Sequence, residues 1–296
     1  MLIPRRERLP NDVLRREDLP ATFAMTDQIG GLLDAPQITA IHITDDYNAA
    51  ISKVGHDRVL YIGAIMWAAL ESDQKIALVA HELGHLVNDD PTRYGLLAAA
   101  LNTLEGWHDM FLPSGLVDEY GNPLYDGGGD VIGNLITGAL RTVIELIWSG
   151  LERLTYFAQQ RAEYLANALS AEIAGRAALV SFLKQIEFAD RMEPVIAGFG
   201  NLRLPKGMDM IRSLADATVN ISAQDRDAAL ARMRDTGHAV DSTHPPTAFR
   251  IAFLQTIPDM PGKLLASDVD FAPIDAELDP PFACVGNRIA ASLTRQ

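Results

Sequence analysis

Ser72–Asn88, SDQKIALVAHELGHLVN, is the most informative stretch of this 296-residue chain. Its apolar residues recur at spacings of three and four, as they do on one face of an amphipathic helix: Ile76, Val79, Leu83, Leu86. Ser72 can cap the first turn, so the pattern predicts a helix over this stretch. Three polar residues, His81, Glu82 and His85, interrupt an otherwise apolar segment, and polar groups in such a setting need a chemical reason.

A metal site supplies that reason. His81 and His85 are four residues apart, so on a helix they project from one face and can chelate a single ion. Glu82 is offset by about 100 degrees, which lets it reach a metal-bound water without being a ligand. A catalytic zinc ion takes three protein ligands and leaves one position open for water. The pattern therefore predicts Zn²⁺ as cofactor and Glu82 as general base.

Glu163 is the best candidate for the third ligand. It lies in QQRAEYLAN, residues 159–167, within a segment that has a helical pattern. Asn167 is four residues further on and on the same face, where its side-chain carbonyl could accept the free N–H of a ligand imidazole. In isolation Glu163 would be interpreted as an ordinary solvated glutamate on a helix. The His-Glu-x-x-His pattern of residues 81–85 (HExxH) favours the ligand role.

A third motif is STHPPTAFRI, residues 242–251. His244 precedes two prolines that stiffen the backbone, and Arg250 begins an apolar run suited to a helix. An imidazole held in this way could donate a hydrogen bond to the oxyanion that develops beside the metal. The simpler alternative is a surface histidine at the start of a helix.

These three motifs, in this order, resemble the HtpX-like metallopeptidases related to the CAAX prenyl endopeptidases, metallopeptidase family forty-eight. The pair Asn48-Ala49, followed by a strand and Gly63, also resembles that family. The resemblance covers about residues 46–255. It implies a mainly helical α+β fold, gluzincin-like, with a small antiparallel sheet whose edge strand lies beside the substrate.

The resemblance also implies the roles of the site residues. Zinc would be held by His81, His85 and Glu163, with Glu82 as the base. His244 would lie near the transition state, and Arg250 would support the site.

The chain departs from the family pattern in three ways. The family usually has Asp at the position of Asn167, so a ligand histidine loses a charged partner. It usually has Ser-Arg at the position of Gln159-Gln160. Many members also carry transmembrane helices between the second histidine and the glutamate ligand. Here that part of the chain holds the apolar stretch 131–148, in which Arg141 and Glu145 are costly in lipid but can pair in water. We expect a buried or interface helix; membrane association is allowed but not favoured.

Two apolar, β-branched runs at 38–43 and 58–63 predict strands, and the polar residues between them favour a turn. The simplest arrangement is a small antiparallel sheet. A peptide could bind by adding a strand along residues 58–63, because main-chain pairing holds varied sequences in an extended form. The substrate-binding residues expected on this basis are Leu60, Tyr61, Ile62 and Gly63.

The predicted organisation has three parts: an N-terminal arm at 1–37, a zinc metallopeptidase domain at 38–257, and a C-terminal extension at 258–296 packed on the domain. Within the domain, residues 107–130 are rich in Gly and Pro and predict a long loop that could cover the site. Residues 131–150 predict the hydrophobic helix.

The amino-acid composition limits the classes of molecule that this protein can bind and the compartment in which it works. A net charge of −14, from 39 acidic and 25 basic residues, argues against a nucleic-acid binder, which needs a basic face. The single cysteine, Cys284, and an N-terminus without an apolar leader favour a cytoplasmic protein. No feature assigns an oligomeric state.

The predicted function is a zinc-dependent endopeptidase that hydrolyses peptide bonds in extended or unfolded polypeptides. One alternative is a zinc-containing scaffold or binding protein that has lost turnover, and another is a helical protein without a metal. An aminopeptidase is a third, although no motif for holding a substrate amine is present.

Overall fold

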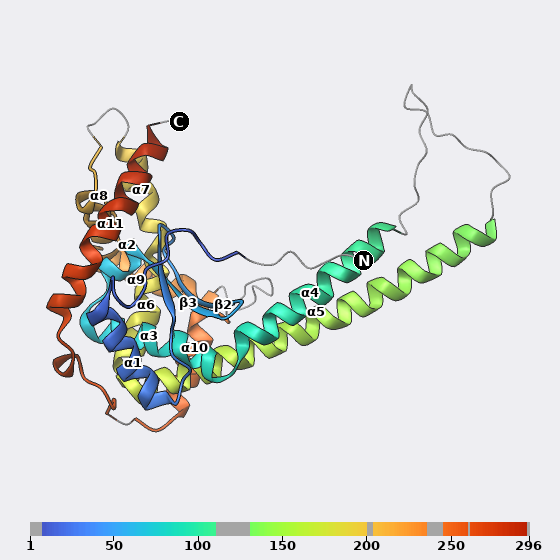
Figure 1. Cartoon of the computed structure of the whole chain (residues 1–296), viewed down its shortest axis with the longest axis horizontal. Helices are drawn as coiled ribbons and strands as arrows, with labels where there is room; N and C mark the ends of the chain where they lie inside the picture. The colour runs from blue at the N-terminus through green and yellow to red at the C-terminus, as the bar shows by residue number, and fades with distance from the viewer. Residues whose placement is uncertain (1–7, 111–130, 200–203, 236–244, 260, 295–296) are drawn as a thin grey trace. The chain divides into compact units, whose positions relative to one another are not determined.

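The computed structural model describes residues 8–110, 131–199, 204–235, 245–259 and 261–294 (Figure 1). Their helices are α1 (Pro20–Leu33), α2 (Ala64–Ala69), α3 (Ser72–Val87), α4 (Asp90–Met110), α5 (Val131–Ala174), α6 (Arg176–Gln185), α7 (Met192–Phe199), α8 (Met208–Val219), α9 (Ala223–Asp235), α10 (Thr247–Thr256) and α11 (Phe271–Leu293), with 3-10 helices η1 (Ile186–Arg191) and η2 (Ala266–Asp268). The strands are β1 (Ala40–Thr44), β2 (Ala49–Val54) and β3 (Asp57–Gly63). The mainly helical α+β class is confirmed.

Contacts divide the chain into two compact units. One holds residues 7–91 and 160–296, so far as they are described, and includes the sheet, α3 and the C-terminal turns of α5. The other holds residues 92–159, which supply most of α4 and the first part of α5. Each unit is described below by itself.

The sheet is mixed, in the order β1-β3-β2. Both expected strands are present, but β1 pairs with β3 in parallel, so the expected antiparallel pairing of these two runs is wrong. The antiparallel partner of β3 is β2, which the sequence did not reveal because its residues are only partly apolar. Gly55, at a φ of 64 degrees, makes the tight turn between β2 and β3.

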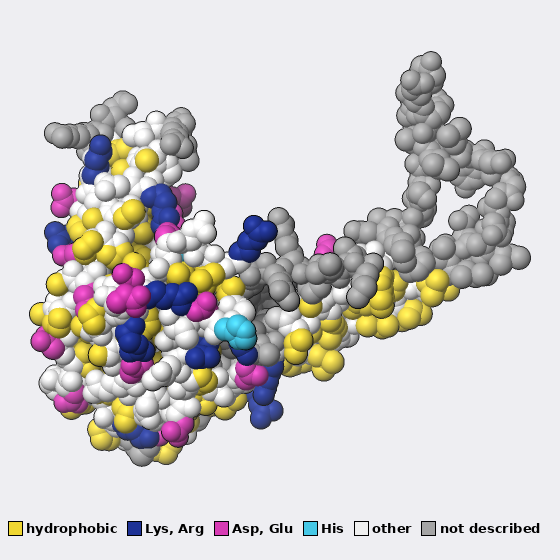
Figure 2. Space-filling view, viewed as in Figure 1, with side chains coloured by type: hydrophobic (Ala, Val, Ile, Leu, Met, Phe, Trp, Pro, Cys, Tyr) yellow, Lys and Arg dark blue, Asp and Glu magenta, His cyan; other side chains and the backbone are white. Residues whose placement is uncertain are grey.

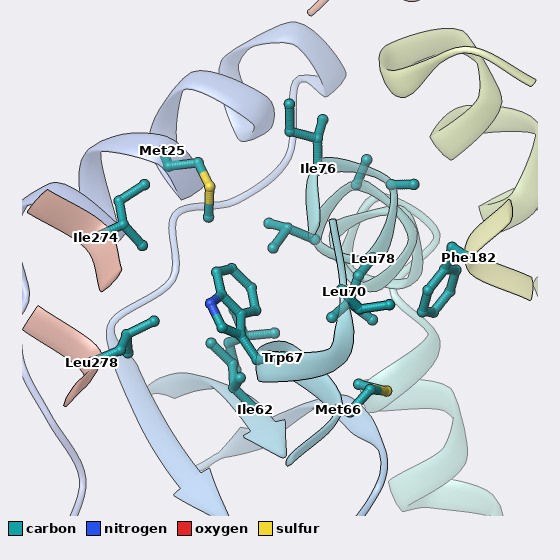
Figure 3. Packing of buried hydrophobic residues seen from close by; sticks show 14 of the residues in the cluster. Met25, Ile62, Met66, Trp67, Leu70, Ile76, Leu78, Phe182, Ile274 and Leu278 are labelled. Carbon is teal, nitrogen blue, oxygen red and sulfur yellow. The ribbon is translucent and has the colours of Figure 1, made fainter. Parts of the chain in front are cut away.

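The core of the larger unit forms around α2 and α3. Trp67 of α2 is 1% exposed and lies on the side of α2 that faces Met25 of α1 and Leu278 of α11 (Figure 3). Residues 1–37, expected as an arm, thus include a helix that belongs to the core, and so do residues 258–296. Both ends of the chain therefore help to hold α3 in place.

The smaller unit exposes much of its apolar surface. In the part of α5 that belongs to this unit, the exposed large hydrophobic residues are Leu140, Val143, Leu146, Ile147, Leu154 and Phe157, and Figure 2 shows yellow side chains along this part of the chain. The described residues of the 131–150 helix are therefore mostly exposed, although Ile144 is buried, and this contradicts the expectation of a buried helix. The alternative expectation, a helix at an interface, stays a prediction. Arg141 does pair with Glu145, at 2.9 Å. Within the described ranges no helix combines the length and the apolar content needed to cross a bilayer.

The first four residues of the predicted loop at 107–130 are helical, so that part of the prediction is wrong. Residues 107–110 are the last turn of α4, and residues 111–130 lie outside the described residues.

Gly63 marks a close approach at the end of β3. A Cβ atom at this position would lie 2.0 Å from the carbonyl oxygen of Asp46 and 2.6 Å from that of Asn48. The Gly63 N–H donates to the same Asn48 oxygen over 2.9 Å. Only glycine fits here, which gives a physical reason for the glycine noted after the predicted strand.

We predict that Gly63→Ala destabilises the protein by about 1–3 kcal/mol, because backbone atoms must move to admit the methyl group. The matched control is Gly31→Ala in α1, where an added Cβ meets nothing within 4 Å and should stabilise the helix by up to ~1 kcal/mol. The measurement is the free energy of unfolding in urea. Equal effects of the two substitutions would contradict the close approach.

Candidate metal centre

Helix α3 carries both histidines and Glu82 into the interior. Ser72 was expected to be the N-cap, but it is the first residue of the helix, and the N-cap is Glu71. The backbone N–H of Glu71 donates to the side-chain oxygen of Gln74 over 2.8 Å. His81, Glu82 and His85 are 4%, 7% and 8% exposed. Burial of three such groups on one apolar helix is costly unless a ligand or partners satisfy them.

The C-terminal part of α5 packs against α3 at very short range. A Cβ on Gly84 would lie 3.0 Å from the Cα of Ala166, so the small residue at this point allows the two backbones to approach closely. One turn further along α5, the Ser170 hydroxyl donates to the carbonyl oxygen of Ala77 over 2.7 Å. This contact places Glu163, which is 4% exposed, beside the two histidines.

The three expected ligands come together. Glu163 Oε2 lies 3.4 Å from His81 Nε2, and Glu163 Oε1 lies 3.4 Å from His85 Nε2. One ligand atom from each residue can be chosen so that all lie within 4.8 Å of one another. Atoms ~2.0–2.2 Å from a tetrahedral zinc ion are separated by roughly 3.4 Å. The donor set therefore fits zinc, and Glu82 stands outside it.

His85 has an outer partner that the sequence analysis missed. Its Nδ1 lies 3.0 Å from Asp90 Oδ2, and Asp90 is 3% exposed. The chain returns to His85 because Asp89, at a φ of 56 degrees, turns the backbone just after α3 ends. A carboxylate on the far nitrogen orients a ligand imidazole and makes its other nitrogen a better donor to the metal. The signal was the acidic pair directly after Asn88.

The pKa values of the two imidazoles are shifted in opposite directions. Burial lowers the pKa of His81 to about 3, more than the neighbouring Glu163 can offset. Burial also acts to lower the pKa of His85, but hydrogen bonds to Asp90 and Glu163 and the charge of Glu82 outweigh it and raise the pKa to about 10. A metal ligand must be neutral imidazole, so a metal that binds at neutral pH has to displace the proton of His85.

Arg250 of α10 reaches the same centre. It is 4% exposed, donates to Asn167 Oδ1 over 2.9 Å, and lies 3.5 Å from Glu163 Oε2. Burial lowers its pKa, while Glu163 and Glu82 act to raise it. The side-chain oxygen of Asn167 therefore accepts from Arg250 and not from an imidazole, which corrects the expected contact. His81 Nδ1 has no hydrogen-bond partner within the described part of the chain.

A cavity of about 550 Å³ opens beside the centre, lined by His81, Glu82 and Arg250 among others. Asn48 and Ala49, at the start of β2, also line it. His244 falls in the range 236–244, which lies outside the described residues, and Pro245 beside it lines the cavity.

The expected substrate strand is wrong. β3, which carries Leu60, Tyr61, Ile62 and Gly63, is the central strand and pairs on both sides. A third partner cannot be added to it, because its main-chain groups already bond to β1 and β2. Leu60 and Ile62 are each 1% exposed and belong to the core. The strand at the cavity is β2.

A buried His-His-Glu set with a glutamate beside it is the arrangement of a metallopeptidase. The sequence profile of Peptidase family M48 matches residues 24–257. The chain belongs to peptidase family M48. The HtpX-like resemblance is confirmed as well, by similarity to curated proteins.

The M48 chain is 24% identical to Protease HtpX of Serratia proteamaculans over 189 residues, 63% of this chain and 60% of that protein. It is 26% identical to Protease HtpX of Salmonella arizonae over 155 residues, 51% of this chain and 52% of that protein. The same values hold for Protease HtpX of Salmonella newport. The chain thus spans between half and three fifths of the length of these relatives. No solved structure gives a significant match.

We predict that Asp90→Asn lowers zinc affinity by about 10–100-fold, because an amide cannot stabilise charge on the imidazole of His85 as a carboxylate does. Competition against a graded series of chelators measures this. Asp89→Asn is the matched control: Asp89 is the exposed neighbour, and asparagine tolerates its left-handed backbone. Equal zinc affinity in the two variants would contradict the role of Asp90 in supporting His85 as a metal ligand.

Proposed function

We propose that this M48 peptidase is a zinc-dependent endopeptidase that cleaves extended or unfolded polypeptides. The observation that carries the proposal is the buried set of His81, His85 and Glu163, with Glu82 beside it on the wall of an open cavity. The ligand spacing supports zinc, since it matches a tetrahedral site. A cytoplasmic location is a further proposal, which rests on the single cysteine.

Each side chain has a step to perform. Zinc, when bound, supplies Lewis acidity that lowers the pKa of water toward ~7 and polarises the scissile carbonyl. Glu82 takes the proton of the attacking water and passes it to the leaving amine. Arg250 holds the carboxylate of Glu163 in place and balances part of its charge. His244 is proposed to donate to the developing oxyanion.

The substrate would pair with β2. This is an edge strand, and no described strand pairs with its other side. Gly63 N–H donates to Asn48 O, and bonded pairs alternate along an antiparallel ladder. The main-chain groups of Ala49 and Ile51 therefore point outward, and Ala49 lines the cavity. A strand added there can run past the site in both directions, which suits cleavage within a chain.

We predict that Glu82→Gln retains zinc and loses at least about 100-fold in kcat, because only the proton acceptor is removed. His81→Ala should instead lose zinc. Zinc content and cleavage of an unfolded protein are measured on the same samples. A fully active Glu82→Gln would refute the assigned base, and a zinc-loaded wild type without cleavage would support the scaffold alternative.

A second prediction tests the edge strand. Ile51→Pro removes an outward N–H without breaking a bond to β3, since proline is tolerated on an edge in this orientation. We expect KM for extended peptides to rise about tenfold at unchanged zinc content, the loss of roughly one hydrogen bond. Ile51→Ala, which trims the side chain and keeps the N–H, is the control. Equal KM values in the two variants would argue against pairing with β2.

A further inference from the structure

In the smaller unit, helix α5 has one side that is shielded from solvent. Its members recur at spacings of three and four residues and are buried or partly buried: Arg141, Ile144, Trp148, Leu151 and Thr155. Helix α4 lies beside α5 in this unit (Figure 1), and Nε2 of His108 is 3.4 Å from Oε1 of Glu145. This side of α5 is thus occupied by contacts within the chain.

A second series lies one residue earlier in each turn, offset by about 100 degrees around the helix. We call it the exposed stripe, and its members are Leu140, Val143, Ile147, Gly150, Leu154 and Phe157. Its five large side chains are between 42% and 68% exposed. The spacing alternates between three and four without interruption, which is the 3.5-residue repeat of a coiled-coil seam. Such a repeat indicates that another helix packs along the stripe.

The exposed stripe has the size of an interface. Together with Leu146 beside it, its large side chains expose roughly 600 Å² of apolar surface, at the upper end of the largest patches on typical monomers. A standard protein–protein interface buries about 800 Å² on each partner. The stripe and the polar residues that flank it are therefore large enough for a stable pair of molecules.

Gly150 lies in the middle of the stripe and is not explained by the described packing of its own chain. A Cβ atom there would meet nothing within 4 Å. A glycine inside a helix costs about 1 kcal/mol relative to alanine, so the position carries a cost without a visible return. Against a second helix, the missing side chain leaves room for a large residue such as Ile147.

We propose that the exposed stripe is a self-association surface, at which two copies of this chain pair their α5 helices in antiparallel orientation. The interface is isologous, so residues equidistant from its centre meet. With the centre midway between Ile147 and Gly150, each isoleucine packs over the glycine of the other copy. This inference goes beyond the proposed function and does not depend on it.

The same symmetry fits the outer positions. Leu140 then lies opposite Phe157 of the other copy, and Val143 lies opposite Leu154, so apolar residues meet along the whole stripe. A parallel pair would place Gly150 opposite Gly150 and leave a gap in the seam, which costs packing contacts. The antiparallel pair is therefore the better packed arrangement.

A lipid surface is the other occupant that exposed apolar side chains allow. The net charge of −14 opposes approach to anionic headgroups, and Glu145 and Glu152 lie on the same helix as the stripe. A helix that lies in a membrane interface also needs no 3.5-residue repeat, only a broad apolar face. These observations favour a second copy.

The first test measures the oligomeric state of the full chain without detergent, by sedimentation velocity over a concentration series. The wild type should form a dimer. Ile147→Asp should raise the dissociation constant at least about 100-fold, because the seam would bury two unpaired carboxylates. Ser149→Asp, at an exposed position outside the stripe, is the matched control and should dimerise as the wild type does. Circular dichroism should show unchanged helix content in both variants.

Cysteine crosslinking tests the orientation on a Cys284→Ser background, because the natural cysteine is exposed. The double variant Leu140→Cys with Phe157→Cys should form a covalent dimer under mild oxidation. Each single variant should not, since its two cysteines would lie ~25 Å apart at about 1.5 Å per residue, too far for a disulfide. Crosslinking by both single variants would show a parallel pair and overturn the antiparallel seam.

Three further results would overturn the inference. A wild type that stays monomeric at its highest soluble concentration would exclude self-association. An Ile147→Asp variant with the dissociation constant of the wild type would place the interface elsewhere. A monomer that floats with vesicles of phosphatidylcholine and phosphatidylglycerol would assign the stripe to lipid. None of these measurements uses peptidase activity, so the inference and the proposed function can fail separately.

Discussion

The close packing of α3 against α5 is the contact on which the functional centre depends. Gly84 and Ala166 let the two helix backbones approach to a distance that a larger residue would not allow. Because Glu163 lies less than one turn from Ala166, this approach sets the separation between its carboxylate and the two histidines at 3.4 Å. Gly84, which lies just before His85, is thus part of the metal site, although it contributes no ligand atom.

The cost of burying this centre is met by a second layer of polar groups. Asp90 engages the far nitrogen of His85, and Arg250 lies between Asn167 and Glu163. Each of these groups is itself buried, so each stays in place only while its partner does. The three contacts come from the turn after α3, from α5 and from α10. Only the contact from α10 joins the ligand set to a distant part of the chain, because Asp90 and Asn167 each follow a ligand by four or five residues.

The sheet makes a different contribution, because its topology decides which strand can meet a substrate. β3 has the more apolar sequence, and for that reason it is the buried central strand, with a neighbouring strand paired along each edge. β2 is less apolar and only partly buried, and it remains at the edge beside the cavity. Strong strand character in a sequence therefore predicts a central strand better than it predicts a binding strand.

The sequence by itself determined the parts of the site that depend on one helix. The spacing of His81, Glu82 and His85 is set by helical geometry, so the pattern specifies their relative directions without knowledge of the rest of the fold. Glu163 was selected as the best candidate on a later helix, with Asn167 on the same face, and the likeness to a family motif implied the same role; helix geometry could not fix its place, because it lies 78 positions after His85. The tertiary structure alone decided that Asp90 turns back to His85, that Asn167 serves Arg250, and that β2 lies at the edge. The first outcome depends on the left-handed backbone of Asp89. The other two depend on how separate elements pack, and packing contacts between distant residues leave no periodic signal along the chain.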